Sequence, residues 1–451
     1  MKKSLLALCI STALCMAFSP AQAQQHSSVK HLAWSKNASI YEANIRQHSP
    51  EGSFKKFQDY LPTLKEMGVK IVWVMPINPI GEKNRKGGLG SYYAVRDYRG
   101  VNPEFGTADD FKQLVKAVHA QGMHIIIDWV ANHTAWDHPW VQAHPDYYEK
   151  DAQGQFIPPV PDWADVISLE FANPALRKEM IEAMRFWLTE YDIDGFRCDV
   201  AAMVPTDFWN EARQELDKTK KVFMLAEAFE TELHEQAFDM TYAWEHKNLF
   251  NDIAQGKKTV KDLDNYLNGD EKKYHPNAYR MLHITNHDLN SWEGTEFQRL
   301  GEATETFLVL SNLMKGMPLL YSGQEAGNTK ALNFFDRDPI EWKAHPFKQI
   351  YTTLFQLKQS NQALWNGTAG GEMKRIKTGK DEQVFAFSRE KGKNKVVAVF
   401  NLSAQAQSID LPGTYTRGKL KNLFTQAPLP VTQKGGVQFE LKPWEYSVFV
   451  K

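Results

Sequence analysis

The chain has 451 residues, of which 24% are charged, and its formal net charge is −1. A chain of this length can bury the core of a large barrel together with one or two smaller domains. Because its charges nearly cancel, it has no general attraction to nucleic acid or to an anionic membrane surface. We therefore expect neither of these as a partner. The chain is also expected to be a monomer.

The first 23 residues have the pattern of a signal peptide. Lys2 and Lys3 precede an apolar run over residues 5–18, and small residues for cleavage follow at 21–23. No later window is apolar enough to span a bilayer, so we expect no membrane insertion. The sequence thus predicts an exported protein, periplasmic or extracellular, whose mature chain begins near Gln24.

The mature chain is expected to contain a single cysteine. Cys9 and Cys15 lie in the predicted signal peptide, which leaves Cys198 and excludes an intramolecular disulfide. Cys198 stands between Arg197 and Asp199 on a predicted strand, so its side chain should point to the opposite side from theirs. We expect a buried, structural thiol.

Short apolar runs alternate with amphipathic segments over about 320 residues. Helices are expected near residues 53–67, 111–122, 174–191, after 207, 303–315 and 347–359, and strands near residues 39–45, 71–75, 125–129, 193–200, 222–227, 238–242, 282–288 and 317–321. Apolar strands between helices favour a parallel sheet covered on both faces, and eight such units favour a (β/α)8 TIM barrel. A doubly wound open sheet is the alternative, but no glycine-rich phosphate loop follows the first strand.

Two segments interrupt or follow the barrel pattern. About 45 residues rich in Trp, His, Asp and Pro follow the third strand, and long connections of this kind are usually functional. After residue 360, strands follow one another without a helical stripe. We therefore predict a catalytic barrel over 24–132 and 174–360, an excursion domain over 133–173, and a C-terminal antiparallel β-sandwich domain over 361–451.

Acidic residues stand at the ends of three predicted strands. They are Asp199, Glu227 and Asp288, and in a barrel of this class catalytic groups lie at the C-terminal strand ends. Arg197 is two residues before Asp199, so both side chains point the same way. An ion pair between them is expected to keep Asp199 ionised and oriented, as a nucleophilic carboxylate requires.

Four ordered motifs carry a resemblance to a known family. They are DWVANH at 128–133, GFRCD at 195–199, the strand ending in Glu227, and NHD at 286–288; residues 93–106 also resemble a family loop. By these motifs the mature chain is identified as a member of the α-amylase family, glycoside hydrolase family 13.

The resemblance implies catalytic roles for the three carboxylates. Asp199 would be the nucleophile that forms a β-glucosyl-enzyme, Glu227 the general acid/base, and Asp288 a residue that grips sugar hydroxyls. Retaining glycosidases need a carboxylate and a carboxylic acid about 5 Å apart, with the pKa of the acid raised. A third carboxylate beside Glu227 would raise its pKa by repulsion.

The resemblance also implies substrate-binding residues. Arg197 would orient the nucleophile, His133 and His287 would bind hydroxyls of the sugar being cleaved, and Tyr93 would stack beneath that sugar. Asp128 would hold the end of the barrel together. Plain packing roles remain open for the histidines and for Tyr93, whose neighbour Tyr92 makes the register ambiguous.

The family's usual calcium site looks incomplete, so no cofactor is expected to be required. Asn132 is present, but Met203 and Ser168 stand where calcium ligands would be expected, and a thioether is a poor ligand for calcium. Calcium at another place, for instance near Asp162 and Asp165, remains open.

The predicted function is hydrolysis of α-1,4-glucosidic bonds in starch, maltodextrins or related α-glucans, with retention of configuration. The expected partner is thus an α-glucan, as the substrate. Val200 after the nucleophile resembles the neopullulanase and oligo-1,6-glucosidase branches, so tolerance of α-1,6 bonds is one alternative. A transglycosidase with the same carboxylates is another. A binding protein that lost its chemistry is disfavoured because none of the three carboxylates is replaced.

Overall fold

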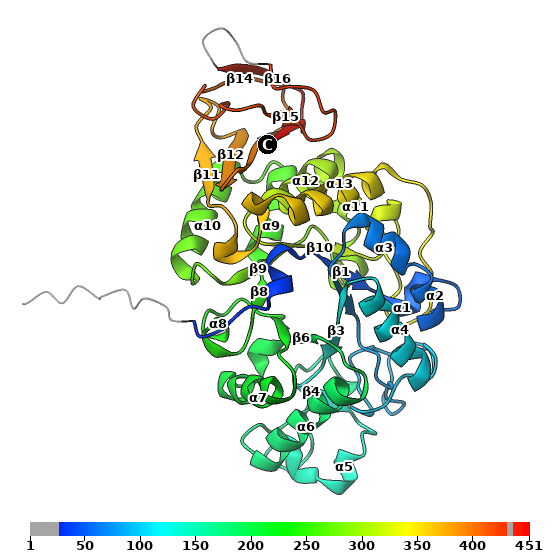
Figure 1. The fold of residues 1–451 in the computed structure, drawn as a ribbon. Coiled ribbons are helices and arrows are strands. Elements are labelled where there is room, and N and C mark those ends of the chain that lie inside the picture. Colours follow the sequence, from blue (N-terminus) through cyan, green and yellow to red (C-terminus); the bar gives the residue numbers. More distant parts are fainter. Residues whose placement is uncertain (1–26, 431–435) are drawn as a thin grey trace, which may run out of the picture.

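The fold is built around a closed barrel of eight parallel strands (Figure 1). The computed structural model describes residues 27–430 and 436–451, so the predicted signal peptide lies outside the described residues. Around the ring the order is β1-β10-β9-β8-β7-β6-β3-β2. The strands are β1 (Ile40–Ala43), β2 (Ile71–Val74), β3 (His124–Trp129), β6 (Gly195–Cys198), β7 (Phe223–Ala226), β8 (Met240–Tyr242), β9 (Tyr279–Leu282) and β10 (Met317–Tyr321).

Helices surround the barrel, as the alternating pattern predicted (Figure 1). Asn173 caps α6 through its side-chain oxygen and Pro174 opens that helix, while Thr107 and Asp110 form a capping box at α4. The helices are α1 (Ile45–His48), α2 (Phe54–Gln58), α3 (Leu61–Met67), α4 (Ala108–Ala120), α6 (Pro174–Glu190), α7 (Thr206–Thr219), α8 (Leu233–Gln236), α9 (Trp244–Ala254), α10 (Val260–Lys273), α11 (Glu296–Leu300), α12 (Thr304–Leu313) and α13 (Pro346–Ser360). Among the described residues, none of the helices has both the length and the apolar character to cross a bilayer.

Side chains alternate between the barrel interior and the helical shell. Trp73 and Ile126 belong to a cluster inside the barrel, whereas Val72 and Ile127 pack with the surrounding helices. This period of two is the geometry of any strand. It also decides which side chains emerge into the barrel mouth, because the interior row of each strand continues past its C-terminal end. Cys198 lies in the outer row and is buried, as predicted.

Two expectations about elements were wrong. The strand expected near 282–288 ends at Leu282, and Asp288 lies beyond it, directly before the π-helical segment η4 (Leu289–Glu293). The turn forms because the Asn286 side chain accepts a hydrogen bond from the backbone N–H of Leu289 at 2.9 Å. The helix expected over 53–67 is two helices, α2 and α3. Pro62, which has no N–H, stands in the first turn of α3.

The excursion after β3 is anchored by a short antiparallel pair. Strand β4 (His133–Ala135) pairs with β5 (Val166–Ser168), and between them lie α5 (Trp140–Ala143) and the 3-10 turn η2 (Pro145–Tyr147). Tyr98 from the barrel donates from its hydroxyl to the carbonyls of Val130 at 2.8 Å and His133 at 3.1 Å. The base of the excursion is therefore fixed to the barrel mouth.

The C-terminal part contains two antiparallel sheets, as predicted. One has the order β11-β12-β13-β17-β15 and the other pairs β14 with β16; apolar side chains of both sheets share one core. The strands are β11 (Met373–Ile376), β12 (Val384–Lys391), β13 (Asn394–Asn401), β14 (Gln407–Leu411), β15 (Lys421–Asn422), β16 (Val437–Leu441) and β17 (Tyr446–Val450).

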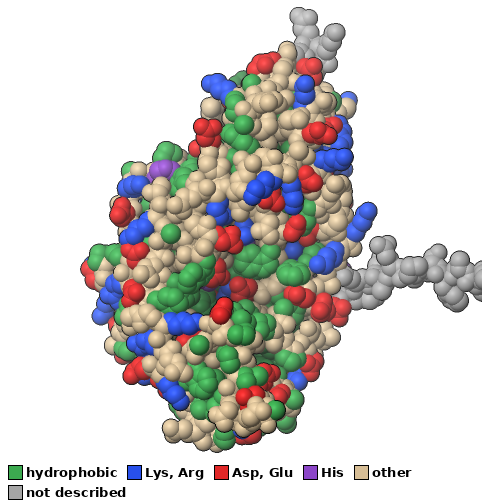
Figure 2. All heavy atoms as spheres, turned by 180° about the vertical axis from the view of Figure 1, so that it is seen from behind, with side chains coloured by type: hydrophobic (Ala, Val, Ile, Leu, Met, Phe, Trp, Pro, Cys, Tyr) green, Lys and Arg blue, Asp and Glu red, His purple; other side chains and the backbone are tan. Residues whose placement is uncertain are grey.

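Arg389 of β12 ties this part to the barrel. Its buried guanidinium donates to the carbonyls of Leu313 at 3.1 Å and Met314 at 2.7 Å, at the C-terminal end of α12. It also donates to the carbonyl of Trp365 at 3.2 Å and to that of Gly371 at 3.2 Å. One side chain thus satisfies four carbonyl groups at the junction. On the face drawn in Figure 2, positive and negative side chains are intermixed, in keeping with the small net charge.

Candidate active site

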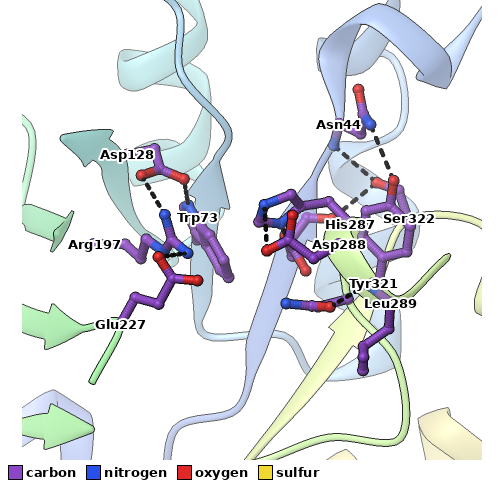
Figure 3. Close-up of polar contacts among 12 residues, drawn as sticks. Asn44, Trp73, Asp128, Arg197, Glu227, His287, Asp288, Leu289, Tyr321 and Ser322 are labelled. Carbon is purple, nitrogen blue, oxygen red and sulfur yellow. Dashed lines mark hydrogen bonds and ion pairs between the residues drawn. The ribbon is translucent and has the colours of Figure 1, made fainter. Parts of the chain in front are cut away.

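Arg197 is the centre of the polar cluster in the barrel mouth (Figure 3). Its Nη1 donates to Oδ1 of Asp128 at 2.9 Å and to Oδ1 of Asp199 at 2.9 Å. Its Nη2 lies 2.9 Å from Oε2 of Glu227, and its Nε donates to the hydroxyl of Tyr242 at 3.2 Å. The structure therefore brings two of the three predicted catalytic carboxylates onto one guanidinium, from adjacent strands.

Asp199 and Glu227 come close together because they extend neighbouring interior rows and because one glycine lets their two strands approach each other. Arg197 is paired in register with Leu225 of β7, so Asp199 and Glu227 continue neighbouring rows. Gly195 opens β6 with φ +155°, and a Cβ atom there would lie 1.9 Å from the carbonyl oxygen of Phe223. Only glycine permits this approach of the two strands.

Burial raises the pKa values of both carboxyl groups, by different amounts. The pKa of Asp199 rises to about 6, because burial and the charge of Asp128 outweigh the opposing effect of Arg197. The predicted ion pair with Arg197 is present, and it opposes this rise in the pKa of Asp199. The pKa of Glu227 rises to about 8 through burial and through repulsion from Asp199 and Asp288, again against Arg197. Near neutral pH, Asp199 is a carboxylate and Glu227 a carboxylic acid.

The backbone after the nucleophile holds Glu227 in place. Val200 has φ +36°, in the left-handed region that β-branched residues rarely adopt. In this conformation its N–H donates to Oε2 of Glu227 at 2.8 Å. The strained residue is therefore part of the site, as such residues often are.

His287 and Asp288 lie across the mouth from Glu227 (Figure 3). The Nε2 atom of His287 lies 2.7 Å from the hydroxyl of Tyr93 and 3.2 Å from Oδ2 of Asp288. Its Nδ1 atom is hydrogen-bonded to Oε1 of Glu42. Burial lowers the pKa of His287, but Asp288 and Glu42 together raise it to about 9. His287 is thus a cation near neutral pH.

Glu42 is a site residue that the sequence reasoning missed, as is Tyr242, which accepts from Arg197. The side chain of Glu42 is fully buried at the end of β1, and its Oε2 atom has no hydrogen-bond partner among the described residues. A usable signal was present in the sequence. Glu42 is the only charged residue of its strand and lies two residues after Ile40, in the interior row.

The structure places Tyr93, rather than Tyr92, in the site. The ring of Tyr93 stacks on that of His287 with centroids 5.5 Å apart, and its hydroxyl donates to Oδ2 of Asp128 at 3.2 Å. Tyr92 points elsewhere and donates to Asn44 at 3.1 Å. Tyr93 is therefore the tyrosine that a sugar over the nucleophile can meet.

His133 lies in the base of the excursion and is neutral. Burial lowers its pKa to about 4. Its Nδ1 atom lies 3.2 Å from Nδ2 of Asn132, and its ring meets Trp163 edge-on at 5.6 Å. A hydrogen bond to the backbone of Tyr93 links it to the site, so His133 lies between the excursion and the sugar-facing tyrosine.

Asn132, Ser168 and Met203, at the positions where the family's calcium ligands were expected, line one pocket of the structure. Asn132 contacts His133 through its side chain, and the thioether of Met203 belongs to a residue that is 45% exposed. Near Asp165, Lys86 fills the place of a cation, with Nζ 3.4 Å from Oδ1 of Asp165. Within residues 27–430 and 436–451, no group of three or more His, Cys, Asp or Glu side chains could hold a metal ion.

Comparison with known proteins decides the family. The family model described as alpha amylase, catalytic domain, matches residues 35–165 and 161–394. The model described as maltogenic amylase, C-terminal domain, matches residues 375–448. The chain belongs to the α-amylase family. It is accordingly a glycoside hydrolase, and the family expected from the four motifs is confirmed.

Individual members of the family cover most of the chain. It is 25% identical to α-amylase MalA of Haloarcula japonica over 84% of this chain, and it spans 57% of that protein's length. The maltogenic α-amylase AmyB of Thermotoga neapolitana matches with a TM-score of 0.83 and 29% identity, over 92% of this chain and 98% of that one. An α-amylase of Lactobacillus plantarum matches with a TM-score of 0.82 and 30% identity, over 93% and 99%.

Proposed function

We propose that this amylase-family enzyme hydrolyses α-1,4-glucosidic bonds of starch or maltodextrins with retention of configuration. The observation that carries the proposal is the shared guanidinium of Arg197. It holds Asp199 and Glu227 side by side, while burial and mutual repulsion give them different protonation states near neutral pH. A carboxylate next to a carboxylic acid is the pair that a retaining glycosidase uses.

The reaction then proceeds in two displacements. Asp199 attacks the anomeric carbon and forms an ester bond, while the bond to the leaving sugar oxygen breaks and that oxygen takes the proton of Glu227. In the second displacement Glu227, now a carboxylate, removes a proton from water, which attacks the anomeric carbon and releases Asp199. Each carboxyl group ends the cycle in its starting state.

The remaining residues would bind the reacting sugar. Asp288 and cationic His287 lie on the side of the mouth opposite to Glu227, where they can bind ring hydroxyls. Tyr93 offers its ring beneath the sugar. The negative charge of Asp199 and Asp288 favours the positive charge that develops on the ring in the transition state. His133 would contribute from the excursion.

The substrate class is proposed from the relatives. They include a maltogenic α-amylase of Bacillus acidopullulyticus, 25% identical over 88% of this chain, and a cyclomaltodextrin glucanotransferase of Geobacillus stearothermophilus, 27% identical over 86%. An oligo-1,6-glucosidase of Parageobacillus thermoglucosidasius is 24% identical over 66%. All are named for α-glucans, but they differ in bond and acceptor. Cleavage of α-1,6 bonds and transglycosylation are therefore the alternatives.

We also propose that the enzyme needs no calcium, acts as a monomer and is exported to the periplasm or the medium. The first part is supported by Ser168 and Met203, which stand where two calcium ligands were expected, and by the ion pair of Lys86 with Asp165. The export rests on the pattern of residues 1–23 alone.

Product analysis tests the proposal. Purified protein is incubated with amylose and with pullulan, with and without a chelator, and early products are followed by chromatography and by proton NMR of the new anomeric centre. Maltooligosaccharides released as α-anomers, little action on pullulan and indifference to the chelator are expected. Release of β-anomers would overturn the retaining mechanism. Rapid panose or maltotriose from pullulan would favour α-1,6 tolerance, and longer products would favour transfer.

A further inference from the structure

A continuous row of aromatic rings leads out of the catalytic centre. Phe334 lies nearly parallel to Tyr93, with ring centroids 6.2 Å apart and an angle of 10° between the planes. Trp292 in turn packs on Phe334 at 5.2 Å and on Phe335 at 5.9 Å. The row therefore connects the ring beneath the reacting sugar to the surface.

Trp292 is the most exposed large apolar side chain among the described residues, at 58%. A single exposed apolar residue needs no explanation. Trp292, however, continues a row that begins at Tyr93, and it stands only four residues after Asp288. An exposed tryptophan face beside a sugar site offers the flat apolar surface on which pyranose rings pack.

Hydrogen bonds hold the outer part of the row in a fixed position. Asn290 of η4 accepts from the N–H of Leu332 at 2.9 Å, and Ser291 donates to the carbonyl of Leu332 at 3.0 Å. Arg46 donates to the carbonyl of Phe334 at 3.2 Å. The segment after β10 is thus tied to η4, so little ordering is required when a ligand binds.

Barrel topology decides which part of a glucan chain this row can meet. Trp292 follows β9 and Phe334 follows β10, which lies three places from β7 around the ring. Glu227 follows β7 and lies across the mouth from Asp288 (Figure 3). The leaving sugar must lie next to Glu227, which protonates it. The row of rings therefore lies on the opposite side, where the retained, non-reducing part of the substrate is held.

We propose that Trp292 and Phe334 bind the second glucosyl unit of the retained part of the substrate, next to the unit over Tyr93. This inference rests on the proposed hydrolysis of α-glucans. It predicts that the enzyme is selective for substrates that place at least two glucosyl units on the non-reducing side of the cleaved bond.

The test uses 4-nitrophenyl α-glucoside and α-maltoside, which share a leaving group and differ by one glucosyl unit. Release of nitrophenol, separated from any nitrophenyl glucoside, gives kcat/KM for each substrate. In the wild type the value for the maltoside should far exceed that for the glucoside. In Trp292→Ala this ratio should fall by about tenfold, the scale of one well-placed aromatic contact.

Two variants serve as controls. Phe424→Ala removes another exposed aromatic ring, in the C-terminal part, and should leave the ratio unchanged. Trp292→Tyr keeps a flat ring and should retain most of the ratio.

A second measurement compares the binding of maltotetraose to Asp199→Asn and to the double variant Asp199→Asn with Trp292→Ala. The Kd of the double variant should be about tenfold higher.

The outcomes separate this inference from the function on which it rests. An unchanged ratio and an unchanged Kd in the Trp292→Ala variants overturn the inference and leave the hydrolase proposal intact. A fall in both kcat/KM values by the same factor also overturns it, because a second-unit contact must act on the maltoside alone. A wild type that releases no sugar from amylose or either glycoside overturns the proposed function and this inference with it.

Discussion

Arg197 of β6 and Asp199, which directly follows that strand, continue the same interior row, and Nη1 of the first donates to Oδ1 of the second at 2.9 Å. The guanidinium is fully buried and faces two further carboxyl groups, those of Asp128 and Glu227. A charge that compensates three acidic groups inside a protein has a large effect when it is lost, because each acid is left in a poorly solvating environment.

Replacement of this charge should destabilise the fold as well as abolish activity. Arg197→Met is expected to lower the free energy of unfolding by about 3–5 kcal/mol, measured by urea denaturation at pH 7. Lys221→Met removes an exposed partner of Asp217 and should change it by less than about 1 kcal/mol. Equal stability of Arg197→Met and the wild type would contradict the role given to this cluster.

Removal of the nucleophile should stop turnover without loss of the fold. Asp199→Asn has nearly the same volume and is expected to lower kcat by about 10⁴-fold or more, with an unchanged circular dichroism spectrum. Asp207→Asn, on the exposed start of α7, should retain activity. An Asp199→Asn variant that still turns over would refute the assignment of the nucleophile.

The pH dependence of kcat/KM should be bell-shaped. Asp199 must be ionised, so the rate falls as pH drops below about 6, where this carboxyl group takes up a proton. Glu227 must be protonated, so the rate falls as pH rises above about 8. Glu227→Gln should lose most activity on natural glucans and lose the alkaline limb. A profile of the variant that still falls above pH 8 would assign that limb to another group.

Glu42 is expected to act through His287. Glu42→Gln removes a negative charge from the Nδ1 side, so the pKa of His287 should fall below its value of about 9, as followed by NMR of labelled histidine. KM for maltooligosaccharides should rise, since a neutral imidazole binds hydroxyls less strongly. Glu305→Gln, which removes a negative charge beside the hydroxyl of Tyr446 and remote from the mouth, provides the control. An unshifted pKa of His287 would exclude this role for Glu42.

The sequence predicted the elements of the barrel better than the contacts across its mouth. The alternation of apolar runs and helical stripes located the strands, and the two-residue spacing of Arg197 and Asp199 placed both in the interior row. These features depend on local periodicity. The position of Asp288 was predicted on a strand because the apolar run continued past Leu282, whereas the side chain of Asn286 turns the chain there.

Properties that depend on distant parts of the chain could not be predicted in the same way. The pKa of Asp199 depends on how deeply the finished barrel buries it, and this effect exceeds that of its neighbour Arg197. Glu42 meets His287 across 245 positions of sequence, and Trp292 meets Phe334 only because the segment after β10 folds back over η4. No short-range pattern encodes these pairs.

The buried guanidinium of Arg389 couples the unfolding of the C-terminal sheets to the unfolding of the barrel. It occupies carbonyl groups at the end of α12 that would otherwise face an apolar junction without a partner. Separation of the C-terminal sheets from the barrel would leave both the cation and these acceptors without partners. The sheets therefore stabilise the barrel even though they supply no catalytic residue. The two parts should therefore melt in one cooperative transition, and a barrel truncated after α13 should be a poor scaffold for transplanting this active site.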